Sequence, residues 1–384
     1  MNPNSTHQES PEPRILLFSQ RNIFEPLVWR CHFQEFERII QEVDSVELVA
    51  PGAKTWYPNG KRVALRLGEF VNIPLNPGVS SFNLGRDYDM FFTVCFGASD
   101  LLHLKALKGW RDRCKTSVCW ITEFYVKDIP VYKSCMGVLA QFDYVIFMFS
   151  ANEPFKSRIK GQGQFLPAGI DTLRFCPYPH PPTRCIDVLS IGRRAQVVHE
   201  ALMQMAQEDR KFYVYDTINA LRAYDLNEHR SMIANMAKRS RYFIVSPGKF
   251  DKPEETGGVS EFGFRYFEAA APGAIMIGLR PANNKEFEKI FNWEDAVIEV
   301  PFTSDAIVGT IRELDKQPDR QMKISQTNVL QCLLHHDWVY RWEAILQMVG
   351  MQPLPMLLDR KQRLKDLAET VKGAQVELQN SWVR

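Results

Sequence analysis

Residues 257–278 read GGVSEFGFRYFEAAAPGAIMIG. Two glycines open this stretch, an amphipathic segment follows, and a proline–glycine pair separates it from an apolar run typical of a buried strand. Glu261, Arg265 and Glu268 are four and three residues apart, which predicts that they share one face of a short helix. Loop amides and a guanidinium suit phosphate, and a carboxylate suits paired ribose hydroxyls. We therefore expect a loop–helix–strand unit that binds a sugar nucleotide, with a solvated ion pair on a surface helix as the alternative.

Outward from this unit, apolar strand-like runs alternate with helical stretches along the whole chain. The alternation predicts the α/β class with mostly parallel sheets. We expect residues 51–86, which are rich in proline, glycine and asparagine, to be irregular. The expected strands are 14–19, 45–50, 90–96, 117–122, 144–149, 186–191, 212–215, 242–245, 274–277 and 296–300, and the expected helices include 26–42, 99–108, 131–140, 318–333, 336–349 and 356–378.

A chain of 384 residues exceeds one ordinary core, which predicts two domains. Residues 171–185 are dense in proline, so we expect them to be a linker that continues neither a helix nor a strand. Two open α/β sheets in one chain imply a cleft, where ligands meet the carboxyl ends of strands. The expected parts are a disordered lead at 1–13, an N-terminal domain at 14–170, the linker, a second domain at 186–335 and closing helices at 336–384.

The composition is that of a globular protein, with 45% apolar residues, 24% charged residues and a net charge of +2. This small net charge, without any long basic block, gives no reason to expect nucleic acid as a partner. The polar amino terminus lacks the apolar region of a signal peptide, and no apolar run reaches the length of a membrane span. Eight scattered cysteines show no paired metal-binding spacing. We therefore expect a cytoplasmic protein with reduced thiols.

Polar side chains follow the expected strands of the N-terminal domain. Arg21 and Asn22 follow the first strand, His103 lies one helical turn beyond the third, and Glu123 follows the fourth. At the carboxyl ends of parallel strands they would face the cleft, where an imidazole or a carboxylate can act on a substrate. The alternatives are a plain turn for Arg21 and Asn22, a helix contact for His103, and a cap or an ion pair for Glu123.

The second half of the chain places cations at equivalent positions. Arg193 follows strand 186–191, and Lys249 follows strand 242–245 at the start of the loop that ends at Gly258. Glycine permits close backbone approach and arginine presents a fork of donors, so this set suits a diphosphate. Solvated cations beside ordinary turns are the alternative.

An acidic triplet, Asp87-Tyr88-Asp89, precedes a strand. A divalent cation in an α/β cleft would need such a pair after a strand, so we expect a turn here. We accordingly expect no metal and no cofactor apart from the sugar nucleotide itself.

Four segments resemble motifs of GT-B glycosyltransferases, in particular the branch grouped with spore-maturation glycosyltransferases. They cover about residues 165–349, whereas the first half matches only through its α/β alternation and position. The segments are LPAGID at 166–171 with Phe175 and Pro177, DVLSIGR at 187–193, RYFEAAAPGA at 265–274 and HDWVYRW at 336–342.

The resemblance implies the GT-B architecture, in which two Rossmann-like domains face a cleft. The N-terminal domain would hold the acceptor, and the C-terminal domain would hold a nucleoside-diphosphate sugar without an essential metal. The resemblance aligns Glu268 with the glutamate that holds the ribose, and Arg193 with the residue that neutralises the diphosphate.

The chain also departs from the pattern of the retaining members. Their first glutamate, seven residues before the second, falls on Ser260, with Glu261 one step away. Their usual lysine after Arg193 is absent, and we expect Lys249 or Arg265 to supply that charge.

These observations predict a hexosyltransferase-like enzyme, retaining and metal-independent, that moves a sugar from a nucleoside-diphosphate donor to a glycan, lipid or small-molecule acceptor. One alternative is a non-catalytic sugar-nucleotide-binding or assembly protein on a degenerate GT-B fold, and another is a sugar-nucleotide epimerase. Cationic and aromatic side chains at residues 54–66 offer contact with a membrane surface, with a solvated loop as the alternative. The expected site residues are His103, Glu123 and Glu261 for catalysis, Arg193, Lys249, Gly258, Arg265 and Glu268 for the donor, and Arg21 and Asn22 for the acceptor or sugar.

Overall fold

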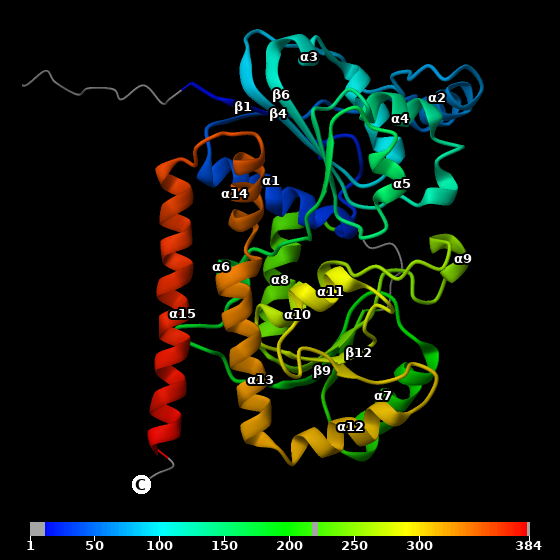
Figure 1. Ribbon diagram of the computed structural model, residues 1–384. Coiled ribbons are helices and arrows are strands. Elements are labelled where there is room, and N and C mark those ends of the chain that lie inside the picture. The colour runs from blue at the N-terminus through cyan, green and yellow to red at the C-terminus, as the bar shows by residue number, and fades with distance from the viewer. Residues whose placement is uncertain (1–11, 217–221, 382–384) are drawn as a thin grey trace, which may run out of the picture.

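A computed structural model describes residues 12–216 and 222–381, and it contains two parallel sheets, one in each half of the chain (Figure 1). The expected α/β class with parallel sheets is confirmed. The expected disordered lead falls mostly on residues 1–11, outside the described residues. The expected linker at 171–185 lies between the last strand of the first sheet and the first strand of the second, and it contains the short helix α6 (Thr172–Phe175).

The N-terminal sheet has six strands in the order β2-β1-β4-β6-β7-β8, and all neighbours are parallel. Its central strands are buried on both faces, which explains why β1 is apolar throughout. The strands are β1 (Ile15–Phe18), β2 (Val46–Val49), β4 (Tyr88–Cys95), β6 (Cys114–Ile121), β7 (Tyr144–Phe147) and β8 (Gln162–Phe165); β3 (Phe82–Asn83) and β5 (Leu107–Lys108) form a separate pair.

The C-terminal sheet has five strands in the order β10-β9-β11-β12-β13, again all parallel. In both sheets the strand order reverses beside the first strand, which opens a crevice at the carboxyl ends. The strands are β9 (Ile186–Ser190), β10 (Tyr213–Tyr215), β11 (Ser240–Val245), β12 (Ile275–Gly278) and β13 (Ile298–Glu299).

Helices cover both faces of each sheet (Figure 1). Those of the N-terminal half are η1 (Val28–Arg30), α1 (Cys31–Val43), α2 (Tyr57–Val71), η2 (Ala98–Ala106), α3 (Trp110–Arg113), η3 (Val126–Asp128), α4 (Lys133–Leu139) and α5 (Glu153–Lys156). Those of the C-terminal half are α7 (Gln196–Glu208), α8 (Leu226–Lys238), α9 (Pro253–Thr256), α10 (Phe264–Ala270), α11 (Lys285–Ile290), α12 (Ala306–Asp315), α13 (Pro318–Gln331), η4 (Cys332–His336), α14 (Trp338–Met348) and α15 (Pro355–Ser381).

The expectation of an irregular segment at 51–86 is wrong, because α2 occupies Tyr57–Val71. Its proline lies in the first turn, where the missing amide is tolerated, and Asn72 ends the helix in a left-handed conformation with φ 54°. Gly68 packs closely on α4, since a Cβ added there would lie 2.2 Å from Ser134 Oγ. The glycines that suggested a loop therefore serve helix packing.

The chain crosses between the two halves twice, and the crossings lie side by side. Ile170 N donates to His336 O at 3.0 Å, and Trp338 N donates to Ile170 O at 3.1 Å. After the second crossing, α14 packs on α1 of the N-terminal domain, where Trp338 stacks on Phe36 with ring centroids 4.5 Å apart. α15 then runs back along both halves (Figure 1), with buried Leu357 and Leu364 packed in the same core.

No helix within residues 12–216 and 222–381 is long and apolar enough to cross a membrane. All eight cysteines are free thiols, and Cys185 is the exposed one.

Candidate functional site

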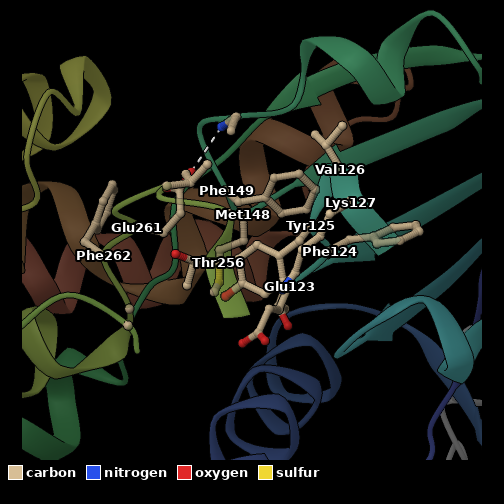
Figure 2. A pocket seen from close by; sticks show the side chains of 16 residues that line it. Glu123, Phe124, Tyr125, Val126, Lys127, Met148, Phe149, Thr256, Glu261 and Phe262 are labelled. Atoms are coloured by element: carbon tan, nitrogen blue, oxygen red, sulfur yellow. Dashed lines mark hydrogen bonds between the residues drawn. The ribbon is translucent and has the colours of Figure 1, made fainter. Parts of the chain in front are cut away.

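Segments that follow β6, β7 and β11 enclose a pocket of about 220 Å³ between the two domains (Figure 2). The carboxyl ends of parallel strands are where an α/β cleft binds its ligand. Two carboxylates, those of Glu123 and Glu261, line the pocket. Its walls are otherwise mostly apolar and include Phe124, Tyr125, Met148, Phe149, Val259 and Phe262.

The prediction that Glu261 shares a helix face with Arg265 and Glu268 is wrong. Helix α10 begins at Phe264, after an extended Gly263, so Glu261 lies in the preceding loop. Arg265 and Glu268 do lie on the helix, three residues apart, and form an ion pair.

Arg265 connects α10 with the turn after β9. Its Nη1 donates to Glu268 Oε2 at 2.5 Å, and its Nη2 lies 3.3 Å from the position that a Cβ on Gly192 would take. Gly192 has φ +88°, a conformation that disfavours other residues, and its missing side chain leaves room for the guanidinium. The Arg265 side chain is 28% exposed and the Glu268 side chain 2% exposed. Glu268 therefore binds the Arg265 guanidinium on the side that faces the protein interior.

Glu268 lies in a buried network that joins the domains. Its Oε1 accepts hydrogen bonds from His32 Nε2 at 2.8 Å and from Arg230 Nη1, and Arg230 Nε donates to Glu35 Oε2 at 2.7 Å. Burial raises the pKa of Glu268, but the positive charges of Arg265, Arg230 and His32 hold that pKa well below its usual value. Because the carboxylate has almost no exposed surface, its position is that of a residue that orients Arg265; the expected ribose contact has no access to it in this arrangement.

His32 comes from α1 and stacks on Phe264 of α10, with ring centroids 3.8 Å apart. Burial and Arg230 lower the pKa of His32, but Cys31 and the Glu268 carboxylate raise it, and the resulting pKa is about 9. At neutral pH His32 is therefore protonated and adds a positive charge beside Glu268.

The two other cations expected at the donor site are also paired with carboxylates. Arg193 Nη1 donates to both oxygens of Asp251 at 3.1 Å. Lys249 Nζ donates to Glu123 Oε1, in the other domain, at 2.6 Å and lies 3.5 Å from Glu255 Oε2. We call Arg193, Lys249 and Arg265 the cleft cations. Each of them is paired with a carboxylate: Arg193 and Lys249 with partly exposed ones, and Arg265 with the buried Glu268.

Glu261 also bridges the two domains. Its Oε1 accepts hydrogen bonds from Ser150 N at 2.9 Å and Ser150 Oγ at 2.8 Å. It also accepts one from Ala151 N at 3.0 Å, which is the dashed line at Glu261 in Figure 2. Asn284 Nδ2 donates to its Oε2 at 3.2 Å. The expected catalytic Glu261 thus lies at the pocket, with its carboxylate held by the loop after β7.

The loop amides expected to bind phosphate are already used. Gly257 N and Gly258 N both donate to Pro253 O, because the two glycines end α9 with φ +67° and +80°. The expectation that Gly258 offers a free amide to the donor is therefore wrong in this arrangement.

His103 lies inside the N-terminal domain and has no exposed surface. Its Nε2 is 2.8 Å from Tyr57 Oη, and its Nδ1 is 2.8 Å from Gln20 Oε1. Burial lowers the pKa of His103 to about 3, so the ring is neutral at pH 7. Since neither nitrogen is free for a ligand, the structure corrects the expectation of a catalytic histidine and gives His103 a role in packing.

Arg21 and Asn22 lie at the carboxyl end of β1, as expected. Arg21 Nη2 donates to Glu37 at 2.6 Å and lines a small recess on the N-terminal side, while Asn22 Nδ2 donates to Ala50 O at 2.8 Å. Both side chains are partly or fully exposed. They remain candidates for acceptor contacts, although neither lines the main pocket.

Asp87 and Asp89 lie at the amino end of β4, opposite to the carboxyl ends, and pair with Arg113 at 3.1 Å and Lys115 at 2.6 Å. Among the described residues, no group of three or more His, Cys, Asp or Glu side chains is placed to hold a metal ion.

Several residues of the site carry no signal in the sequence. His32 and Arg230 are helix residues far along the chain from Glu268, and nothing in their local pattern sets them apart. Asp216 differs, because it directly follows β10 and accepts hydrogen bonds from Gly192 N at 3.0 and 2.9 Å. The strand-end argument that identified Arg193 would also have identified Asp216.

Residues 193–347 match a protein family described as glycosyl transferase-like. A search of curated proteins finds no match. Among solved structures, an alpha-glucosyltransferase in complex with UDP is similar over 88% of this chain and 99% of that chain, with a TM-score of 0.55 and 11% identity. An alpha-glucosyltransferase in complex with UDP-glucose and DNA containing an abasic site is similar over 88% of this chain and 100% of that chain, with a TM-score of 0.52 and 10% identity. At this identity the similarity establishes the fold.

Proposed function

We propose that the protein is a glycosyltransferase that moves a sugar from a nucleoside-diphosphate donor to an acceptor bound on the N-terminal domain, because it has the GT-B fold and its residues 193–347 match a glycosyl transferase-like family. The single observation that carries this proposal is the convergence of the cleft cations. Arg193 follows β9, Lys249 follows β11, and Arg265 reaches the β9 turn from the helix that leads to β12. Three cations at the carboxyl ends of adjacent strands suit a diphosphate.

In the proposed reaction the glycosidic bond breaks and its electron pair goes to the departing diphosphate. The cleft cations stabilise that negative charge, so we propose that the chemistry needs no metal ion. Arg265 is oriented for this role by Glu268, which is itself fixed by Arg230.

Donor binding also has a consequence for the acceptor side. A phosphate bound to Lys249 takes the place of Glu123, which now occupies Lys249 at 2.6 Å. The released carboxylate lies on the wall of the pocket and can accept the proton of an acceptor hydroxyl as its oxygen bonds to the sugar. The apolar wall formed by Tyr125 and Phe149 suits the non-reacting part of a glycan, lipid or small-molecule acceptor.

The first test measures binding of nucleoside diphosphates by calorimetry, with uridine, guanosine, adenosine and thymidine diphosphates as probes. Arg193→Ala and Arg265→Ala should each raise the dissociation constant about tenfold to a hundredfold, the range expected for one charge-assisted hydrogen bond. Arg312→Ala is the matched control, since Arg312 of α12 pairs with Asp209 outside the cleft. Its side chain is 47% exposed, close to the 43% of Arg193. Chelation of divalent ions should leave the dissociation constant unchanged.

The results also separate the alternatives. An absence of binding to all four diphosphates would favour an assembly protein, for which the serine at position 260 is the specific reason. Conversion of a sugar nucleotide without any acceptor would indicate an epimerase. Retention of configuration at the transferred sugar is part of our proposal, and proton NMR of the product checks it. One structurally similar alpha-glucosyltransferase was solved in complex with DNA. For this chain we propose a glycan, lipid or small-molecule acceptor. We also propose a cytoplasmic location.

A further inference from the structure

Helix α2 exposes apolar side chains that no part of the described chain covers. Phe70 is 82% exposed, Val63 54% and Leu67 43%. Val71 is also 54% exposed, and Trp56, just before the helix, is 49% exposed. Exposed large apolar side chains are ordinary when scattered, but four of them on one helix and a fifth just before it form a patch that indicates an interaction surface.

The exposed residues follow helical spacing. Val63, Leu67, Phe70 and Val71 are separated by four, three and one residues, which places them on one side of the helix. The neighbouring side of the helix, with Tyr57, Ala64 and Gly68, is buried against the N-terminal domain. The helix is therefore already anchored by one face, and a second apolar face points to solvent.

The cations beside this face lack carboxylate partners. Lys54, Arg62 and Arg66 form no ion pair with any described residue, and Glu69 is the only acidic residue between positions 51 and 76. By contrast, the arginine and lysine of the cleft, Arg193 and Lys249, are paired with carboxylates. We call these apolar and cationic side chains together the α2 face.

We propose that the α2 face docks the protein on an anionic membrane surface. In this arrangement Phe70, Leu67 and Val63 enter the boundary between headgroups and acyl chains, while Arg62 and Arg66 bind the anionic headgroups. A second copy of the chain is a poor occupant, because two α2 faces would bring their unpaired cations together. Charge complementarity therefore favours the bilayer, and the inference is independent of the donor and the reaction.

The position of α2 determines how the docked protein would be oriented on the membrane. Helix α2 belongs to the N-terminal domain and lies on the side of the molecule away from α15 (Figure 1). A chain held by α2 would keep its N-terminal domain at the bilayer and leave α15 on the far side.

The test is flotation of the full-length protein with vesicles of phosphatidylcholine alone or mixed with phosphatidylglycerol. The unchanged protein should float with the mixed vesicles and not with the neutral ones, and added salt should weaken the association. Phe70→Ser should lower the partition constant about tenfold, the loss expected for one buried aromatic side chain. Arg62→Glu with Arg66→Glu should abolish flotation.

Phe212→Ser is the matched control, since Phe212 is 56% exposed in the C-terminal domain, and it should float like the unchanged protein. Melting temperatures establish that all variants fold. Failure of the unchanged protein to float with anionic vesicles would overturn the proposal, as would equal flotation of Phe70→Ser. Concentration-dependent dimerisation that Phe70→Ser removes, seen by sedimentation velocity without vesicles, would overturn it in favour of a second copy.

Discussion

At the scale of single residues, the cleft is a set of ion pairs that a ligand must rearrange. Arg193 is paired with Asp251 and Lys249 with Glu123, both with partly exposed side chains. Partly exposed pairs of this kind contribute little to stability, so the diphosphate of the proposed donor would displace their carboxylates at small cost. The pairs around Glu268 are buried, and removing one partner there leaves an uncompensated charge. The same residue types therefore serve ligand exchange at the surface and fixed orientation beneath it.

The pKa of His32 gives the first prediction at this scale. His32 has a pKa of about 9 in the folded protein and an ordinary value of 6.5, so the folded state holds this proton more tightly. Its contribution to the free energy of unfolding is complete below about pH 6.5 and is lost as pH rises through 9, with a size on the order of 3 kcal/mol.

Denaturant unfolding across this pH range, compared between the unchanged protein and His32→Gln, measures that contribution. The difference in stability should shrink between pH 6.5 and pH 10. A difference that stays constant over this range would mean that His32 is not protonated in the folded protein.

The positions of the cleft cations could be predicted from the sequence, but their ion pairs could not. Arg193 and Lys249 could be placed because a residue that follows a parallel strand must lie at the carboxyl edge of the sheet. The pair of Lys249 with Glu123 and the network of Glu268 with His32 depend on which domain surfaces meet, and no local pattern encodes that. For the same reason His103, which also follows a strand, was expected at the cleft although it packs inside the domain.

At the scale of elements, the unit from α10 to β12 depends on the turn at Gly273. This residue has φ +74°, and a Cβ added to it would lie 2.7 Å from Ser325 Oγ and 2.8 Å from Ser325 O. The glycine thus stops α10 and lets α13 approach the turn. Because β12 lies next to β11 in the sheet, this turn also fixes where the strand ends meet the cleft.

Gly273→Ala should therefore destabilise the protein by at least the 1–2 kcal/mol that the left-handed conformation costs a residue with a Cβ. Thermal unfolding followed by circular dichroism measures the effect. Gly309→Ala is the matched control, because Gly309 lies inside α12 with nothing within 4 Å of an added Cβ, and it should stabilise the helix by about 0.5–1 kcal/mol. Equal melting temperatures for the two variants would contradict this account of the turn.

Most elements were predictable because their apolar periodicity is long and regular, as in β4, β11 and α13. Helix α2 was not, for two physical reasons. Its proline and glycines favour loops in the absence of tertiary contacts, and its apolar residues occupy two faces, one buried and one exposed. An exposed apolar face removes the contrast between polar and apolar sides on which helix prediction depends.

At the scale of the whole molecule, Arg360 of α15 holds the two chain crossings together. Its Nη2 donates to Asp171 Oδ1 at 2.7 Å and to Asp337 Oδ2 at 2.8 Å. Asp171 begins the segment after the first crossing, and Asp337 caps α14 after the second. Through Arg360, helix α15 therefore binds both of the segments that connect the two domains.

Arg360→Met should lower the free energy of unfolding by about 3 kcal/mol, since it leaves two buried carboxylates with fewer partners. Hydrogen exchange should become faster in residues 171–175 and 337–348 together, because both crossings lose the same anchor. Arg363→Met is the control on the same helix, as Arg363 is exposed and forms no ion pair with a described residue. Faster exchange confined to α15 would show that the arginine fastens the helix alone.

Under the proposed function, the paired cations of the cleft also determine how a donor is found. Field lines that start on Arg193, Lys249 and Arg265 end on carboxylates a few ångströms away, so little potential extends beyond the cleft mouth. A sugar nucleotide is not attracted from a distance, and its encounter rate should be that of ordinary diffusion, insensitive to ionic strength. The cleft then distinguishes among the anions of the cell only when they are bound. Only a molecule with two linked phosphates replaces more than one carboxylate at once.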